Sequence, residues 1–580
     1  MRPRRGLSTF VAGALVGAIL GGIVGVGGTA KILVDHPQFA SRLKGWLSGG
    51  ASAVDTIPIG SLADVTVRVD TSAGGSTISP YIYGVALADE ATLRALGATV
   101  NRWGGNPSSS YNWANGHAWN AARDWEFRNG NYGHGSGRIA DQFISDTLAA
   151  GAVPLVSIPS IGFVAKNDDN STQSVGVPNQ GGPPAAPGSA AIQGYDPAPN
   201  RARTSVASYP TKPGPFVLSP APDSTAVYQD EWVHEMVSRF GAAPAGVRYF
   251  AIDNEPDLWS EVHTDVHPVR MSYADMLNMY QQYSLAVKAQ SPNALLLGPD
   301  VSGWTAYFYS SLDRGPDAFA THADQAAHGG QPFLPWWLGQ VASADRQRGS
   351  RSLDLLDVHF YPQAQGVFSA ASDPSTQALR IRSVRSLWDP TYRDESWIND
   401  NVQLIPRLKQ WVGEQYPGTG IAITEYSWGG EKDASGAVAL AEVLGTFGRE
   451  GVTLATYWTY PEPNSPAGAA FRLYRNFDGK GAAFGDVSLP VKSSRPGVTA
   501  FAARHSNGSE IDVVLINEAP NQTAGVHLDL GLRSILSATQ YQIKAGSSAI
   551  VLSPVADVSR TTLDLPPYSV TLIQVVHHGA

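Results

Sequence analysis

Short apolar runs recur through most of the chain, and segments long enough for a helix separate most of them. The eight runs cover residues 81–86, 98–103, 153–158, 247–254, 294–300, 355–362, 421–428 and 453–460. Consecutive apolar positions are typical of strands that are buried on both faces of a parallel sheet. Eight such strands alternating with helices predict the α/β class and a (β/α)8 TIM barrel, which we place at residues 80–484.

The pattern changes after residue 484, where apolar and polar positions alternate and no helix is indicated. Alternation of this kind predicts half-buried strands, here at 498–504, 511–517, 526–530, 541–545, 549–552 and 570–576. Near the other end of the chain, Val65, Val67 and Val69 alternate with polar residues in the same way. We therefore expect an all-β sandwich at 485–580, completed by an N-terminal strand within 64–79.

The first 34 residues have the pattern of a membrane or export signal. Arg2, Arg4 and Arg5 precede the uncharged stretch 6–30, which as a helix of about 1.5 Å per residue would span roughly 38 Å. Basic residues remain on the cytoplasmic side, so the rest of the chain would be exported. The segment is either an uncleaved single-pass anchor or a cleaved signal peptide. Residues 35–63 then form a linker or stalk, and the body is extracytoplasmic, at the cell membrane or secreted.

Composition excludes several functional classes. The 580 residues carry a formal net charge of -9, and a nucleic-acid partner would require a clustered basic surface that this chain lacks. Cysteine is absent, which excludes disulfides, thiolate nucleophiles and cysteine zinc sites. Fifteen Trp and 22 Tyr supply many aromatic faces, on which sugar rings can stack, although most aromatic residues belong to the core.

Polar side chains end several of the predicted buried strands, at the edge where (β/α)8 enzymes have their active sites. Glu255 follows the fourth predicted strand and Glu425 lies in the seventh. Each glutamate by itself fits an ordinary strand-end turn or ion pair. Two carboxyl groups at the same end of one barrel are what glycosidic cleavage needs, because one protonates the leaving oxygen and the other faces the anomeric carbon.

Six segments resemble glycoside hydrolase family 44, and the resemblance extends from about residue 64 to the carboxyl terminus. They are NRWGGN at 101–106, DNEPDLW at 253–259, DVHP at 265–268, LWDPTY at 387–392, ITEY at 423–426 and YRNFDG at 474–479. The resemblance implies a barrel with a β-sandwich and retaining, endo-acting hydrolysis of β-1,4-glucans such as xyloglucan and soluble cellulose. It assigns Glu255 as the acid/base and Glu425 as the nucleophile. The N-terminal segment and stalk are not part of the family pattern.

Four further polar residues are candidates for the site. Asn254 is expected to bind the sugar 2-hydroxyl, a contact that strengthens in the transition state. His359 and Tyr361, on the sixth strand, are expected to orient Glu425, or else to form a structural pair beneath the loops. Arg102 is expected to hold a carboxylate, either at the site or in a plain structural ion pair.

Three tryptophans are candidate platforms for sugar rings. Trp458 lies in the eighth predicted strand, while Trp103 and Trp428 end the second and seventh runs. We expect no cofactor and no metal in the site, because no acidic segment has the ligand spacing of a known calcium loop. The expected partner is a β-1,4-glucan polysaccharide, with a monomeric body and membrane contact only through an uncleaved N-terminal helix.

Two alternatives remain open from the sequence. The first is a carbohydrate-binding envelope protein that kept the barrel without catalysis, although such a protein would need neither Glu255 nor Glu425. The second is a hydrolase of mannan, xylan or an envelope glucan, because substrate choice resides in the loops of a barrel that supports many chemistries.

Overall fold

The computed structural model describes residues 60–119, 129–131, 139–165, 227–263, 267, 269–315 and 319–578. The expected membrane or signal helix within residues 1–34 lies outside these ranges, as does most of the expected stalk. Among the helices of the described ranges, none is long and apolar enough to cross a membrane.

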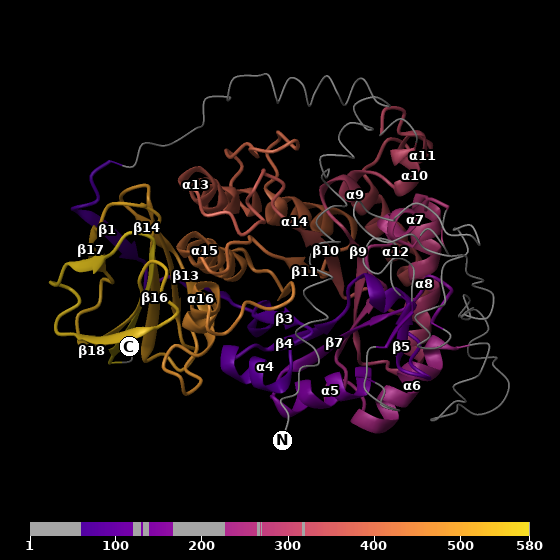
Figure 1. Cartoon of the computed structure of the whole chain (residues 1–580), viewed down its shortest axis with the longest axis horizontal. Coiled ribbons are helices and arrows are strands. Elements are labelled where there is room, and N and C mark those ends of the chain that lie inside the picture. The colour runs from indigo at the N-terminus through magenta and orange to yellow at the C-terminus, as the bar shows by residue number, and fades with distance from the viewer. Residues whose placement is uncertain are drawn as a thin grey trace. The chain divides into compact units, whose positions relative to one another are not determined.

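Eight parallel strands form a closed barrel, as the recurrent apolar runs predict (Figure 1). Each strand overlaps one of the eight predicted runs. Going round the barrel, the strand order is β10-β11-β12-β3-β4-β7-β8-β9. The strands are β3 Gly84–Ala86, β4 Val100–Trp103, β7 Val153–Ile158, β8 Tyr249–Ile252, β9 Leu295–Val301, β10 Leu355–Phe360, β11 Gly420–Tyr426 and β12 Leu454–Tyr457.

Helices connect the barrel strands and begin at recognisable capping residues. Asp89, Ser272 and Asp433 each accept a hydrogen bond from a backbone N–H of the first turn that follows them. The helices are α4 Glu90–Leu96, α5 Ile139–Ala149, α6 Gln229–Phe240, α7 Trp259–Val262, α8 Tyr273–Gln290, α9 Trp304–Phe308, α10 Ser311–Arg314, α11 Ala323–Ala327, α12 Phe333–Arg348, α13 Pro374–Ser383, α14 Leu404–Gln415, α15 Ala434–Glu450 and α16 Pro466–Arg475.

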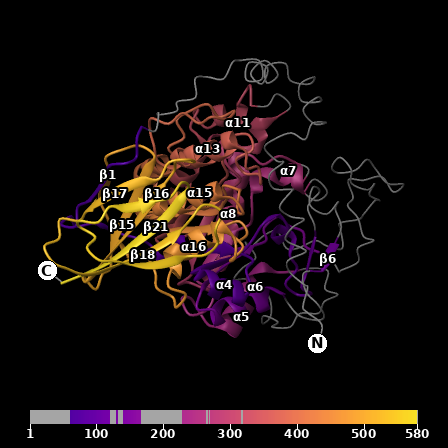
Figure 2. The same ribbon diagram turned by 60° about the vertical axis from the view of Figure 1, so that its left-hand side comes forward.

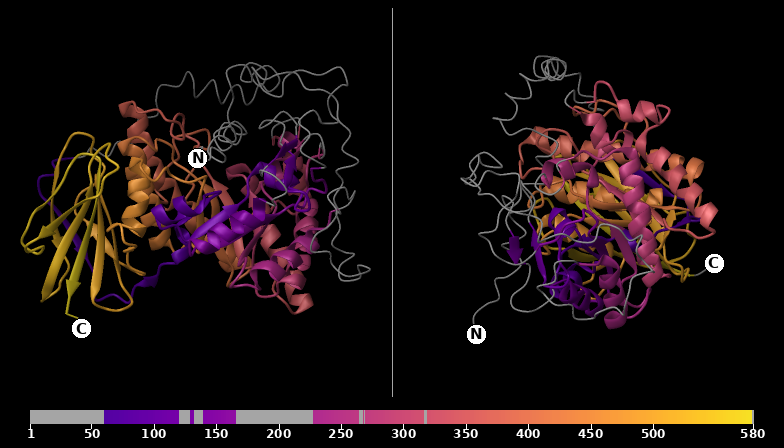
Figure 3. Two further views of the ribbon diagram at one scale, coloured as in Figure 1. Left: turned by 60° about the horizontal axis from the view of Figure 1, so that its bottom comes forward. Right: turned by 90° about the vertical axis from the view of Figure 1, so that its right-hand side faces the viewer.

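Two antiparallel-rich sheets follow the barrel and confirm the predicted β-sandwich (Figures 2 and 3). One sheet has the order β14-β1-β17-β20 and the other β19-β18-β21-β16-β15-β13-β2. The sequence pattern missed the short strands β2, β13, β14 and β20. The strands are β1 Val65–Val69, β2 Ser76–Thr77, β13 Val487–Leu489, β14 Val491–Ser493, β15 Val498–Arg504, β16 Glu510–Asn517, β17 Ala524–Asp529, β18 Ile535–Ile543, β19 Val551–Val555, β20 Leu563–Leu565 and β21 Ser569–His577.

The N-terminal strand β1 belongs to the sandwich, as its alternating pattern predicts. It pairs in parallel with β17 and antiparallel with β14. Val65, Val67 and Val69 are buried in the sandwich core, while Thr66 and Arg68 point away from it. Strand β1, near the start of the described residues, therefore completes a sheet whose other strands come from the C-terminal part of the chain.

The described residues form two compact units. The first unit is made of the described residues within 101–360 together with Gln410–Thr424, and the second of residues 60–100, Tyr361–Lys409 and 425–578. Within the second unit, α15 packs on strands β15, β16 and β21. Any side chain at Gly445 of α15 would meet the ring of Phe501 at 2.3 Å, so only glycine fits this approach.

Candidate active site

Glu255 lies three residues beyond the last residue of β8, in the first unit, and its backbone is fixed by a neighbouring strand end. Its N–H donates to the Asp300 carbonyl oxygen at 2.9 Å. The backbone of Glu255 has φ of +42°, a left-handed conformation that a non-glycine residue adopts only when its surroundings enforce it. Only 4% of the residue is exposed. The strand end therefore presents one well-positioned, nearly buried carboxyl group.

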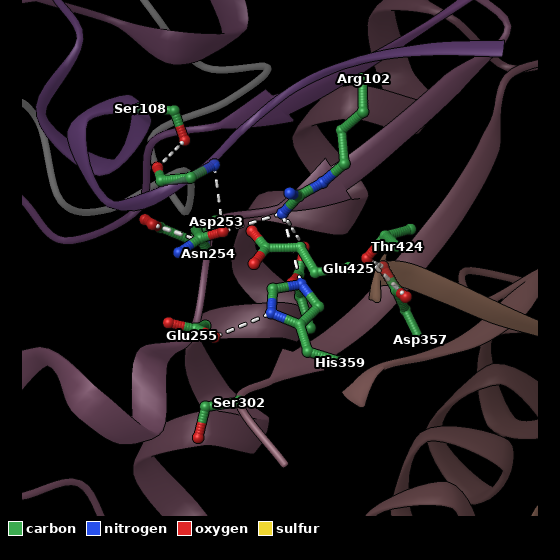
Figure 4. A network of polar contacts seen from close by, with 12 residues as sticks. Arg102, Ser108, Asp253, Asn254, Glu255, Ser302, Asp357, His359, Thr424 and Glu425 are labelled. Carbon is green, nitrogen blue, oxygen red and sulfur yellow. Dashed lines mark hydrogen bonds and ion pairs between the residues drawn. The ribbon is translucent and has the colours of Figure 1, made fainter. Parts of the chain in front are cut away.

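His359 of β10 contacts the Glu255 carboxyl group (Figure 4), and its other ring nitrogen contacts the carboxylate of Asp300. Its Nδ1 lies 2.9 Å from Glu255 Oε1, and its Nε2 lies 2.5 Å from Asp300 Oδ1. The side chains of His359 and Asp300 are completely buried. We had expected His359 to orient Glu425. The structure places its ring between Glu255 and Asp300, the penultimate residue of the neighbouring strand β9, and a role in orienting Glu425 stays a prediction.

Arg102 of β4 is fully buried and joins Asn254 to Asp300. Its Nη2 donates to Asn254 Oδ1 at 2.8 Å and lies 3.4 Å from Asp300 Oδ2, which fits the expectation that Arg102 holds a carboxylate. Asn254 Oδ1 also accepts from the Gly105 N–H at 3.1 Å, and its Nδ2 donates to Asn106 Oδ1 at 3.1 Å. Three hydrogen bonds therefore fix the amide of Asn254 next to the acid/base candidate.

Two buried aspartates in this network are biased to opposite protonation states. Burial would raise the pKa of Asp300, but the charges of His359 and Arg102 outweigh that effect and hold it below its usual value. Burial and the charge of Asp300 raise the pKa of Asp357, on β10, to about 8. Thr424 Oγ1 lies 2.8 and 2.9 Å from the two Asp357 carboxyl oxygens. At neutral pH Asp300 is therefore ionised and Asp357 is mostly protonated.

Glu425 lies near the end of β11, in the second unit, and is 2% exposed. The Tyr361 hydroxyl group donates to its Oε2 at 2.7 Å, as the sequence leads one to expect. Tyr361 directly follows β10, and its ring packs edge-on against Phe368 with centroids 5.1 Å apart. The phenol is thus held in place and supplies a neutral hydrogen-bond donor to the carboxylate.

The three tryptophans predicted as sugar platforms are largely buried. Trp103 packs edge-on against Tyr111 and Phe143, and the Trp428 indole donates to Ser383 Oγ at 3.0 Å. Trp458 follows β12, and its backbone N–H donates to the Tyr426 carbonyl oxygen at 3.1 Å. A role in sugar binding stays a prediction for all three residues.

Trp397, an exposed tryptophan in the same unit as Glu425, was not among the residues predicted from the sequence. Trp397 is 40% exposed, and its indole N–H donates to Gln363 Oε1 at 3.2 Å. The Gln363 amide in turn donates to the backbone carbonyl of Tyr361 at 2.8 Å. An exposed indole is therefore tied, through Gln363, to the segment that carries the hydroxyl donor of Glu425. No periodicity marks Trp397, since it lies in a loop.

Asp300 and Asp357 were also missed, for different reasons. Asp300 closes the apolar run of the fifth strand, so the rule that singled out Glu255 and His359 would have found it. Asp357 lies inside the sixth strand, where a buried aspartate has no sequence signal that separates it from a structural residue.

A (β/α)8 barrel with nearly buried glutamates at the ends of its fourth and seventh strands defines the class of barrel glycoside hydrolases. Comparisons with known proteins agree. The family model for glycoside hydrolase family 44 matches residues 118–364. Endoglucanase A of Paenibacillus lautus is 34% identical over 485 residues, which are 79% of this chain and 64% of the relative. This chain therefore spans less than two thirds of that relative's length.

Two solved structures resemble the whole described body. The bifunctional glucanase-xylanase CelM2 from a metagenome library is 35% identical with a TM-score of 0.78, and the match covers 89% of this chain and 99% of CelM2. A xyloglucanase of Paenibacillus polymyxa is 30% identical with a TM-score of 0.76, over 89% of this chain and all of that one. The chain belongs to glycoside hydrolase family 44.

Proposed function

We propose that this protein is a retaining endo-β-1,4-glucanase that hydrolyses xyloglucan or a soluble cellulose chain. The observation that carries the proposal is the unequal environment of the two glutamates. Glu255 faces an imidazole and a charged network, which suits a group that gives up and regains a proton. Glu425 accepts from a neutral phenol, which suits a carboxylate that forms and breaks a covalent bond.

The reaction takes two steps that need both glutamates. In the first, Glu425 attacks the anomeric carbon while Glu255 protonates the glycosidic oxygen, so that the C–O bond breaks and a glycosyl-enzyme forms. In the second, Glu255 removes a proton from water, which displaces Glu425 and restores the original anomeric configuration. Asn254 supports the first step by binding the sugar 2-hydroxyl group. Because both glutamates end strands of one closed barrel, this assignment agrees with where barrel enzymes bind substrates.

The choice of a β-glucan rests on the relatives. One is an endoglucanase, one is a xyloglucanase and one acts as both a glucanase and a xylanase. Xylan is therefore the second candidate substrate. The exposed ring of Trp397 is the proposed stacking platform for a sugar that lies outside the reacting position.

The decisive experiment is a hydrolysis assay on xyloglucan, carboxymethylcellulose, mixed-linkage glucan, mannan and xylan, with Glu255→Gln and Glu425→Gln proteins beside the wild type. We expect the wild type to release reducing ends from a β-1,4-glucan with a rapid fall in viscosity, and both variants to drop to background. NMR of the first product should show the β-anomer. A folded wild type that releases nothing would favour the carbohydrate-binding alternative, and an α-anomer would exclude the retaining mechanism.

We also propose that the body acts outside the cytoplasm, either secreted or held by an N-terminal anchor. The support is the run of uncharged residues 6–30 after Arg2, Arg4 and Arg5. Fractionation of producing cells, followed by N-terminal sequencing of the mature protein, tests this. Protein in the medium that begins beyond residue 30 indicates a cleaved signal, an intact N-terminus in the membrane fraction indicates an anchor, and cytoplasmic protein contradicts both.

A further inference from the structure

His359 contacts the proposed acid/base residue with one ring nitrogen and Asp300 with the other. The mechanism above does not use the contact with Asp300. The imidazole ring bridges two carboxyl groups, with Nδ1 2.9 Å from Glu255 Oε1 and Nε2 2.5 Å from Asp300 Oδ1. All three side chains are at most 6% exposed. Water therefore competes little for either ring nitrogen, and the two carboxyl groups determine where the ring protons lie.

The proton on Nε2 is assigned by comparing its two neighbours. Asp300 Oδ1 approaches Nε2 at 2.5 Å, whereas Arg102 Nη2, a donor, lies 3.4 Å away. A ring nitrogen that carries a proton can donate a hydrogen bond to the carboxylate, but it has no free electron pair with which to accept one from the guanidinium. The shorter contact, to a negatively charged oxygen, is the stronger one. The contact is an ion pair without regular hydrogen-bond geometry at Asp300 Oδ1, and this close negative charge favours a proton on Nε2.

The other buried acids near the ring do not replace Asp300. Asp357 lies on the same strand as His359, and its pKa of about 8 leaves it mostly neutral at pH 7. Asp257 follows β8, and burial raises its pKa as well. Arg102 adds a positive charge, which would by itself drive a proton off the ring. Of these groups in the first unit, Asp300 is the anion that balances a charged imidazole.

We infer that Asp300 is a positioning residue for the acid/base step: it keeps His359 protonated on both ring nitrogens, so that Nδ1–H donates to Glu255 Oε1. The other carboxyl oxygen, Oε2, is then left to carry the reacting proton. This inference rests on the proposed role of Glu255. It parallels the way in which a buried carboxylate fixes the orientation and tautomer of a catalytic or metal-binding histidine.

The proton balance of the first step follows from this arrangement. The proton on Glu255 Oε2 moves to the glycosidic oxygen, and the electrons of the breaking C–O bond go to that oxygen while Glu425 bonds to the anomeric carbon. Glu255 becomes a carboxylate whose new charge is stabilised by Nδ1–H of His359. In the second step Oε2 takes a proton from water. His359 keeps both of its protons throughout.

Without the charge of Asp300 the imidazole would lose its second proton near neutral pH. Nδ1 would then accept the proton of the Glu255 carboxyl group, and that proton would point at the ring instead of at the leaving oxygen. Acid catalysis would fail, while attack by Glu425 would not. The loss should therefore be large for substrates with a poor leaving group and small for those with a good one.

The experiment compares Asp300→Asn with Asp345→Asn in the full chain. Asp345 is a matched control, since it is a buried aspartate of the same unit that accepts hydrogen bonds from Ser352 and Tyr416. Each protein is assayed on a cello-oligosaccharide and on 2,4-dinitrophenyl β-cellobioside across a range of pH. For Asp300→Asn we expect kcat/KM on the oligosaccharide to fall by about 100-fold. We also expect the alkaline limb of the pH profile of kcat/KM to move to lower pH by about one unit or more. The dinitrophenyl substrate should change by less than about threefold.

An equal fall on both substrates, with an unmoved alkaline limb, would overturn the inference and leave Asp300 a merely structural residue. A second readout needs no turnover. In a protein with 15N-labelled histidine, the ring signals of His359, assigned with a His359→Gln variant, should report two protonated nitrogens in the wild type and in Asp345→Asn. Asp300→Asn should lose that state. Unchanged signals contradict the inference, and if the wild type hydrolyses no glycoside the proposed function fails while this spectrum still decides the inference.

Discussion

Glu255 and Glu425 both lie at the ends of buried barrel strands, yet their carboxyl groups have different neighbours. Glu255 contacts an imidazole that is itself held by Asp300 and lies close to Arg102. Glu425 accepts a hydrogen bond from the phenol of Tyr361. The first environment can respond to a change of charge, because it contains groups that titrate or are ionised. The second supplies an uncharged hydroxyl donor to the carboxylate.

Under the proposed mechanism, this difference suits the opposite tasks of the two glutamates. A carboxyl group that donates a proton and takes one back needs partners that accommodate both of its charge states. A carboxylate that attacks carbon needs one fixed donor and a fixed orientation. The predictions below test this division of labour, from the largest expected effect to the smallest.

The largest effect should come from removing each glutamate and supplying azide as a replacement nucleophile. Glu425→Ala should be inactive, and azide should restore cleavage of an aryl β-cellobioside with an α-glycosyl azide as the product. Glu255→Ala should still cleave a 2,4-dinitrophenyl glycoside, and azide should then give the β-glycosyl azide. NMR of the products distinguishes the two anomers. Exchanged products would mean that the two roles are assigned the wrong way round.

Removing the phenol donor should slow the hydrolysis of every substrate to a similar extent. Tyr361→Phe loses one hydrogen bond to a charged group, which contributes about 1.5–3 kcal/mol and corresponds to roughly 10- to 100-fold in kcat/KM. The matched control is Tyr416→Phe, whose hydroxyl donates to the carboxylate of Asp345 at 2.6 Å and has no place in the mechanism. Steady-state assays on activated and unactivated glucosides should show the same loss for both. A loss confined to poor leaving groups would assign Tyr361 to the acid side instead.

The neutral state of Asp357 should appear in the pH dependence of stability. Its native pKa is about 8, so the folded protein keeps a proton that the unfolded chain releases near pH 4. This contribution is fully present below pH 4 and is lost as the pH rises towards 8. Asp357→Asn cannot titrate, so its melting temperature relative to wild type should rise between pH 5 and pH 9. A constant difference over that range would mean that Asp357 is ionised in the native state.

The smallest effect should come from the exposed indole in the unit of Glu425. Trp397→Ala removes one aromatic platform, which is worth about 0.5–1.5 kcal/mol and predicts a rise in KM of roughly two- to tenfold on a polysaccharide. The kcat on a short aryl glycoside should not change. Leu552→Ala, at an exposed apolar residue of the sandwich, is the control. An unchanged KM on long substrates would remove Trp397 from the proposed binding surface.

The sequence by itself determined the barrel and the positions of its two key glutamates. Each barrel strand is buried on both faces, so its apolar run is continuous and can be recognised without any partner. Glu255 and Glu425 are polar residues at the ends of such runs, where a buried strand has no use for a charge. The alternation at Val65, Val67 and Val69 likewise indicated a half-buried strand, although its partners β14 and β17 lie more than 400 positions away in the chain.

Only the tertiary structure decided which partners each glutamate has. His359 and Tyr361 are two positions apart in sequence and were expected to serve the same carboxylate. In the fold, the ring of His359 lies between Glu255 and Asp300, while the hydroxyl of Tyr361 reaches Glu425. The charge of Asp300 and the neutrality of Asp357 also depend on burial and on neighbours from other strands. Side-chain contacts and protonation states are set by distances across the barrel, and a linear sequence does not contain those distances.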